Sequence, residues 1–146
     1  MIALFGNSLD EIGIGLGEWF RKQTTYKFNP PFAAIGFLDS NGNIQGVAIF
    51  NDFNDSNIDV HIYVPKCLTR ANIKLVYNYV FNQLKCNRLT AKPYRSNKVL
   101  LRLLPRMGFQ YEAVLKQYYG KNRSDDAIIY RLTRDSALKW VDKNNA

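Results

Sequence analysis

Chemically active side chains are concentrated in residues 58–64. Four apolar residues alternate there with three other residues, Ile58, Val60, Ile62 and Val64 against Asp59, His61 and Tyr63. This period of two predicts a β-strand with Asp59 and His61 on the same face. A histidine titrates near neutral pH, and either side chain could take a proton from a reacting amine. Asp59 and His61 are therefore candidate general bases, and a hydrogen-bonded structural role is the alternative for His61.

Other catalytic arrangements have less support. His61 is the only histidine in the chain, which excludes a metal site built from several histidines, and we predict no metal. A Ser-His-Asp triad would lack a nucleophile motif. Cys67 could be a nucleophile because a helix N-terminus lowers the pKa of a thiol, or it could simply be a small residue in a turn. With Cys86 it makes only two cysteines, which we expect to be reduced.

Periodicity and turn residues divide the rest of the chain into elements that would position this strand. Ser8 and Glu11 have the spacing of a capping box and open a predicted helix at 8–23. The other predicted helices include residues 73–84 and begin at about Asn97. The predicted strands cover 32–39, 43–50, 58–64, 88–94, 110–119 and 127–133, with an Asn41-Gly42 turn between the first two. Strand, helix and strand over 58–94 form a βαβ unit, in which the two strands should be parallel.

Several residues in the C-terminal half have a characteristic spacing. Asn97 opens a helix, Gly108-Phe109 follows eleven residues later, Glu112 stands three beyond Phe109, and a final strand contains Ile129-Tyr130-Arg131-Leu132. Together with the order of elements, this spacing resembles the GNAT superfamily of N-acetyltransferases, most closely the branch that contains the ribosomal-protein N-acetyltransferases.

The resemblance implies a single acyl-CoA N-acyltransferase-like domain over residues 1–146. Its fold would be α+β, with a mixed sheet of about six or seven strands and three or four helices. The activity it implies is transfer of an acetyl group from acetyl-CoA to an amine of a protein or small molecule, by direct attack of the amine.

The resemblance also places the cofactor. In that family two neighbouring strands splay apart and the pantetheine arm lies between them; here these would be 58–64 and 88–94. A backbone N–H near the end of the first strand would steady the oxyanion. The pyrophosphate would lie at the N-terminus of the next helix, which Thr69 would cap. The residues implied in cofactor binding are Ile62, Tyr63, Val64, Lys66, Cys67, Leu68, Thr69, Arg70, Ala71 and Asn97.

The sequence departs from the family pattern at positions that matter for chemistry. Cys67 and Thr69 stand where that family usually has glycines, so the pyrophosphate-binding turn is degenerate. Leu104 stands where many members have a tyrosine that protonates the leaving thiolate. We therefore expect Tyr94 or Ser96, at the end of the preceding strand, to supply a proton donor instead.

Charge is distributed unevenly along the chain. Residues 1–84 carry six Lys/Arg and seven Asp/Glu, whereas residues 85–146 carry fourteen and five. The positive half favours polyanions such as a phosphate-rich cofactor, nucleic acid or an acidic protein. Two alternatives to the enzyme remain open: a GNAT-fold protein that binds or modifies nucleic acid, and a catalytically degenerate interaction module.

The apolar runs and the first residues bear on the location of the protein. No apolar run reaches the roughly 18 residues needed to span a bilayer, and the first six residues are too short and uncharged for a signal peptide. We therefore expect a cytoplasmic protein without a membrane partner, either a monomer or a homodimer.

Overall fold

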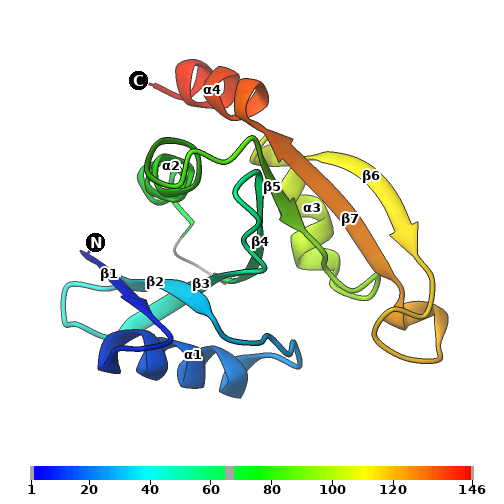
Figure 1. Ribbon diagram of the computed structural model, residues 1–146, viewed down its shortest axis with the longest axis horizontal. Coiled ribbons are helices and arrows are strands. Elements are labelled where there is room, and N and C mark those ends of the chain that lie inside the picture. Colours follow the sequence, from blue (N-terminus) through cyan, green and yellow to red (C-terminus); the bar gives the residue numbers. More distant parts are fainter. Residues whose placement is uncertain (1, 65–67, 146) are drawn as a thin grey trace.

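The computed structural model of the chain describes residues 2–64 and 68–145. Its fold is α+β, built on a seven-stranded mixed sheet in the order β1-β2-β3-β4-β5-β7-β6 (Figure 1). The strands are β1 Ile2–Asn7, β2 Phe32–Leu38, β3 Ile44–Asn51, β4 Asn57–Tyr63, β5 Arg88–Ala91, β6 Gln110–Leu115 and β7 Ala127–Thr133. The α-helices are α1 Glu11–Gln23, α2 Arg70–Tyr77, α3 Lys98–Arg106 and α4 Arg134–Lys143.

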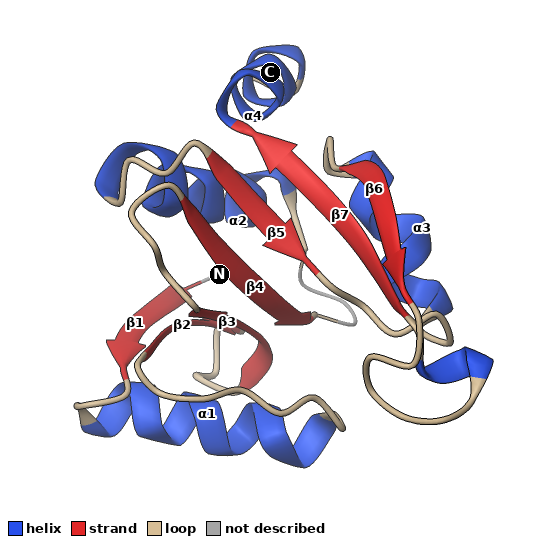
Figure 2. Ribbon diagram, turned by 45° about the vertical axis from the view of Figure 1, so that its right-hand side comes forward, coloured by secondary structure: helices blue, strands red, loops and turns tan. Residues whose placement is uncertain are grey.

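Helices cover the two faces of the sheet (Figure 2). α1 lies against β1, β2 and β3 and closes a small aromatic-rich core: Leu16, Phe20, Tyr26, Phe28, Phe32, Ala34, Val47 and Ile49. α2 and α3 lie on the opposite face over a larger core that includes Val80, Leu89 and Leu104. Because β4 alternates between the two faces, Val60 and Ile62 join the larger core while Tyr63 packs on the α1 side.

One strand pair has an unusual geometry. β4 and β5 are parallel, as the βαβ pattern predicted, and the other neighbouring strands are antiparallel. The parallel pairing runs from Asn57 opposite Arg88 to Val60 opposite Ala91, and stops there. β4 continues to Tyr63, still paired with β3 on its other side. The two central strands therefore separate beyond Val60, which leaves one side of the end of β4 without a strand neighbour.

The start of α1 differs from the capping-box prediction. Asp10 is the N-cap, and its carboxylate accepts hydrogen bonds from the backbone N–H groups of Gly13 and Asn7. The Ser8 hydroxyl instead accepts from the N–H of Phe32. A Cβ at Gly13 would lie 1.9 Å from the carbonyl oxygen of Asn7, so this glycine allows the helix to approach the end of β1.

The helices that follow β4 begin where the sequence predicted. Thr69 caps α2 by accepting from the N–H of Asn72, and a π-helical segment, Asn78–Gln83, continues the helix. Asn97 caps α3 by accepting from the N–H of Leu100. α3 ends one residue after Pro105, and Gly108 then adopts a φ of 94°, which a glycine tolerates without strain.

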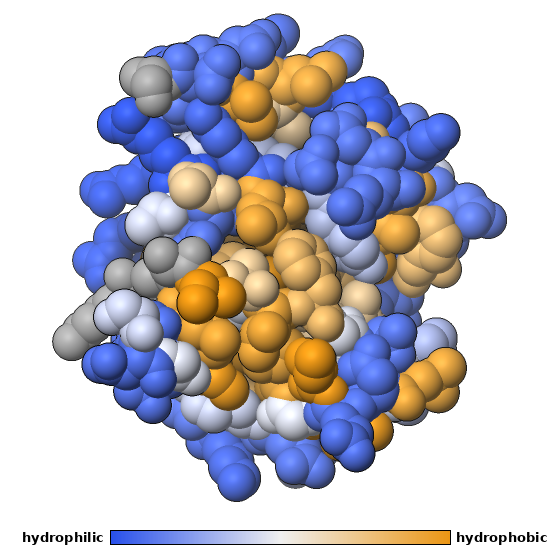
Figure 3. Space-filling model, turned by 90° about the vertical axis from the view of Figure 1, so that its left-hand side faces the viewer, coloured by the Kyte–Doolittle hydropathy of each residue, from blue (hydrophilic) through white to orange (hydrophobic). Residues whose placement is uncertain are grey.

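Two elements were missing from the sequence prediction, β1 and α4. β1 forms an edge of the sheet and pairs with β2, and Ile2 and Phe5 on it are 57% and 48% exposed. Seen from the side of Figure 1 on which β1 lies, apolar side chains gather in an area surrounded by hydrophilic residues (Figure 3). α4 packs Ala137 into the larger core, and its Trp140 donates from Nε1 to the carbonyl oxygen of Arg106.

The C-terminal hairpin is shorter than predicted. β6 ends at Leu115 because the chain turns there, with Gln117 at a φ of 55°. Its register with β7 shifts between Tyr111 and Ala113, which places Glu112 in a bulge. Within the described parts of the chain, no helix has the length and apolar character needed to cross a membrane.

Candidate functional site

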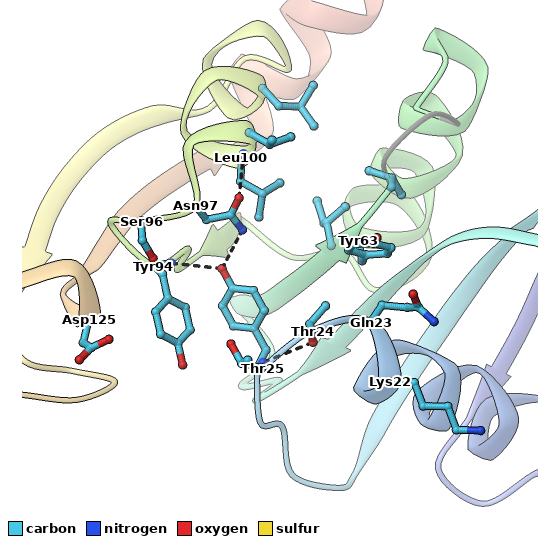
Figure 4. A pocket seen from close by; sticks show the side chains of 15 residues that line it. Lys22, Gln23, Thr24, Thr25, Tyr63, Tyr94, Ser96, Asn97, Leu100 and Asp125 are labelled. Atoms are coloured by element: carbon cyan, nitrogen blue, oxygen red, sulfur yellow. Dashed lines mark hydrogen bonds between the residues drawn. The ribbon is translucent and has the colours of Figure 1, made fainter. Parts of the chain in front are cut away.

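A cleft of about 730 Å³ opens beside the end of β4 (Figure 4). Three segments form most of its wall: residues 22–26 at the end of α1, residues 62–64 at the end of β4, and residues within 94–103 around the start of α3. Asp125 adds a carboxylate at its rim. The cleft thus lies beside the part of β4 that is no longer paired with β5. The tertiary fold brings together there segments that are about 40 residues apart in sequence.

Beside the cleft is a small space that shares part of its lining. That space, of about 10 Å³, is lined by Val60 and His61 of β4 and by Ala91 at the end of β5. Three residues line both the cleft and the small space: Tyr26, Ile62 and Leu100. Of these three, Tyr26 alone carries a hydroxyl group.

Tyr26 holds the two sides of the site together. Its hydroxyl oxygen accepts a hydrogen bond from the backbone N–H of Tyr94 at 3.1 Å and another from Nδ2 of Asn97 at 3.2 Å. The side-chain oxygen of Asn97 simultaneously accepts from the N–H of Leu100 at 3.3 Å, as Figure 4 shows with dashed lines. Burial raises the pKa of Tyr26, although the hydrogen bonds from Asn97 and Tyr94 act in the opposite direction.

His61 is held as a neutral ring. Its Nε2 lies 3.1 Å from Oδ1 of Asn51, an acceptor, so Nε2 carries the proton and donates it. The ring stacks on Phe28 with centroids 6.3 Å apart. Burial lowers the pKa of His61 to about 4, and the charge of Asp59 offsets this only in part. His61 is therefore uncharged at neutral pH.

Asp59 belongs to an ion pair and lines neither the cleft nor the small space. Its Oδ2 lies 2.9 Å from Nζ of Lys92, and its Oδ1 accepts from Nδ2 of Asn57. The Asp59 and Lys92 side chains are only 9% and 18% exposed. Burial acts to lower the pKa of Lys92, but the hydrogen bond and charge of Asp59 raise it, so Lys92 stays charged at neutral pH.

The other predicted catalytic residues both line the cleft. The Tyr94 ring stacks on Tyr119 with centroids 4.0 Å apart and planes within 10°. Ser96 is exposed at the rim, and Figure 4 shows it beside Tyr94 at the start of α3.

The residues predicted to hold the cofactor are divided among three places. Ile62, Tyr63 and Val64 line the cleft, as does Asn97. Leu68 packs at the edge of the larger core, Thr69 caps α2, and Arg70 and Ala71 are exposed in the first turn of that helix. Lys66 and Cys67 lie outside the described residues.

Sequence reasoning missed the segment 22–26, and with it Tyr26. Nothing in Thr24-Thr25-Tyr26 marks a site, because the residue acquires its role by meeting Asn97 from across the fold. Its position just after a predicted helix, before a pair of prolines, was the one available signal. Among the residues that the structure describes, no group of three His, Cys, Asp or Glu side chains could hold a metal ion.

Comparison with known proteins gives a fold but no sequence family. No family model matches the chain, and no curated protein sequence matches it. Mutant forms of the spermidine/spermine N-acetyltransferase SpeG from Vibrio cholerae superpose with a TM-score of 0.73, covering 94% of this chain and 98% of that chain at 16% identity. A GCN5-related N-acetyltransferase from Brucella melitensis gives a TM-score of 0.62 over 84% of this chain and 61% of that chain, at 19% identity.

These likenesses establish that the chain has the GNAT fold. The overlap with SpeG covers nearly the whole of both chains, so the element order and the sheet topology correspond. The sequence expectation of an α+β domain with six or seven strands and three or four helices is confirmed.

Proposed function

We propose that this protein is an acetyl-CoA-dependent N-acetyltransferase that acts on an amine by direct attack. The observation that carries the proposal is the cleft at the point where β4 and β5 separate beyond Val60 and Ala91. An extended chain can lie there against the unpaired side of β4 in the manner of an added strand.

The residues present fit an elongated ligand with an anionic end. The cleft wall is mainly apolar on the α3 side, where Val99, Leu100 and Leu103 face it. The positive end of the α2 dipole and the exposed cation of Arg70 lie together at the start of α2, and both favour a pyrophosphate. The proposed roles of Lys66 and Cys67 in the preceding turn remain predictions from sequence. When bound, acetyl-CoA would supply the acetyl group as a reactive thioester.

An ammonium group cannot attack the thioester, so the acceptor amine must lose its extra proton first. Neither sequence candidate is well suited to remove it, because His61 has its pKa lowered to about 4 and Asp59 is paired with Lys92. We therefore propose that water takes the proton from the amine. A backbone N–H of residues 62–64 is the proposed donor to the oxyanion.

The cofactor part of the proposal is tested by thermal and urea denaturation with acetyl-CoA. Ligand at about 100 times its Kd should add about 2.7 kcal/mol to the free energy of unfolding. Arg70→Ala should weaken binding about fivefold, as expected for loss of about 1 kcal/mol, whereas Lys139→Ala on exposed α4 should not. No stabilisation of the wild type at millimolar acetyl-CoA would refute the cofactor assignment.

The acceptor is proposed to be an aliphatic amine. The solved structures named above include an N-acetyltransferase for spermidine and spermine, so these polyamines belong in the first panel. A lysine-containing peptide and a peptide with a free N-terminus complete it. Release of CoA thiol above spontaneous hydrolysis, with the acetylated amine found by mass spectrometry, would support the proposal. Binding of acetyl-CoA without turnover of any amine would instead favour a degenerate interaction module.

A second candidate function is nucleic-acid binding. α3 presents Lys98, Arg102 and Arg106 on its exposed side, where they could contact phosphates. Such binding should weaken steeply as salt rises from 50 to 200 mM. Failure to bind RNA or DNA, or binding whose affinity does not change with salt, would exclude this second function.

A further inference from the structure

The Tyr26 hydroxyl has a proton that the surrounding protein does not use. Both hydrogen bonds to its oxygen come from donors, the N–H of Tyr94 and the amide of Asn97. Neither can accept the phenolic proton, and among the described residues no hydrogen bond runs from this hydroxyl to an acceptor. Because Tyr26 lines both the cleft and the small space, its proton is available to a group that is bound beside it in the cleft.

The ring is held firmly in that position. Tyr26 is 9% exposed, and its ring meets Tyr94 and Tyr119 edge-on with centroids 5.1 and 5.9 Å away. The His61 ring lies 6.0 Å from it. Its backbone N–H donates to the hydroxyl of Thr24. A side chain fixed on several sides presents its hydroxyl in one place, as a proton donor in a site must.

The same two donors would stabilise Tyr26 after it has lost its proton. A phenolate needs hydrogen-bond donors, and the Tyr94 N–H and the Asn97 amide already point at the oxygen. The other hydroxyls near the site lack this arrangement. That of Tyr119 donates to the carbonyl oxygen of Lys92, and that of Thr24 donates to Phe20.

We propose that Tyr26 is a catalytic residue that protonates the departing thiolate during acetyl transfer; this rests on the function proposed above. As the amine nitrogen bonds to the acetyl carbon, the carbon–sulfur bond breaks and its electron pair goes to sulfur. Tyr26 passes its phenolic proton to that sulfur, and Tyr94 and Asn97 hold the resulting phenolate. The neutral amine loses one N–H proton to water as its nitrogen becomes the amide nitrogen, and water returns a proton to the Tyr26 phenolate, so the step balances.

The kinetic test uses two variants that preserve the shape of the site. Tyr26→Phe removes only the hydroxyl. Asn97→Asp keeps an oxygen to cap α3 but turns the donor into an acceptor, so that the Tyr26 proton is held by residue 97 and withheld from the cleft. Both should lower kcat by about a hundredfold or more while the Kd for acetyl-CoA changes less than threefold. Tyr111→Phe, an exposed tyrosine on β6, should behave as wild type.

A binding measurement gives a readout independent of turnover. Ultraviolet titration of CoA bound to the protein reports when its thiol ionises. A donor at sulfur favours the thiolate, so the apparent pKa of bound CoA should be at least one unit higher in Tyr26→Phe than in wild type. If Tyr26→Phe does not fold, the thiol pKa of bound CoA is compared between wild type and Asn97→Asp. That variant also keeps the Tyr26 proton from the sulfur.

The outcomes separate this inference from the proposed function. A fall in kcat of less than about tenfold in these variants would overturn the role of Tyr26. An equal thiol pKa in wild type and variant would do the same, as would a kcat that rises because Tyr26 merely obstructs the cleft. In these cases wild type still binds acetyl-CoA and acetylates an amine, so the proposed function stands. A wild type that fails to bind CoA would remove the function and the inference together.

Discussion

The ring of His61 and the side-chain amide of Asn51 form a hydrogen bond of 3.1 Å between neighbouring strands β4 and β3. Asn51 in turn donates from Nδ2 to the carbonyl oxygen of Asn29, so its oxygen is left to accept the proton of His61. Asn51 is buried, and the half-buried ring of His61 lies beside Phe28 and Tyr26. This geometry stabilises a neutral histidine, and protonation of the ring would place a charge in an apolar setting.

We predict that His61 makes the protein sensitive to mild acid. Its pKa is about 4 in the folded chain against 6.5 ordinarily, so between these values the unfolded chain binds more protons. Stability is therefore full above pH 6.5 and is lost as pH falls towards 4, by about 2 kcal/mol between pH 7 and pH 5. His61→Gln should lose this dependence in urea denaturation. A variant with the same acid sensitivity as wild type would contradict the prediction.

The Asp59–Lys92 pair should be costly to break on one side only. Lys92→Met leaves a carboxylate with 9% exposure uncompensated, and should lower the free energy of unfolding by about 3 kcal/mol. The double variant Asp59→Asn with Lys92→Met should recover most of this loss, because neither charge remains. Lys139→Met, at an exposed site, is the control. Additive losses in the double variant would show that the two charges do not stabilise one another.

Two glycines of α1 should respond to alanine in opposite directions. A Cβ at Gly13 would meet the backbone of Asn7 at 1.9 Å, whereas nothing lies within 4 Å of a Cβ at Gly15. Gly13→Ala should therefore destabilise the protein by about 2 kcal/mol or more. Gly15→Ala should stabilise it by about 0.5–1 kcal/mol, because alanine favours a helix. Thermal unfolding of both variants tests the pair, and equal effects would contradict the packing of α1 on β1.

Glu112 is predicted to support structure rather than activity. It forms an ion pair with Arg88 at 2.6 Å, and this hydrogen-bonded contact holds the pKa of Glu112 below its usual value. Glu112→Gln should cost less than about 1 kcal/mol, since both side chains are about one third exposed. The loss should be present at pH 7 and vanish in acid, where the wild-type carboxyl is protonated too. Acetyl transfer slowed more than twofold would argue for a direct role.

The sequence predicted the elements whose patterns are local. The alternation of apolar residues gave β4 within one residue, and hydroxyl or amide caps placed the starts of α2 at Thr69 and α3 at Asn97. β1 was missed because its six residues form a strand only by pairing with β2, 30 residues further along. α4 was missed although Thr133 caps it, because its apolar face is short: Ala137 is its buried residue, and the larger core that Ala137 joins is assembled from distant parts of the chain.

The candidate site divides in the same way. The sequence by itself determined β4, the charges and the starts of α2 and α3, and its resemblance to a known family implied the α+β class and the placing of Ile62 and Asn97 in one site. Only the tertiary structure decided which of the polar residues are free to react. It neutralises His61 by burial, pairs Asp59 with Lys92, and brings Tyr26 to Asn97 from 71 residues away. Burial and hydrogen-bond partners arise from long-range packing, which local sequence patterns do not contain.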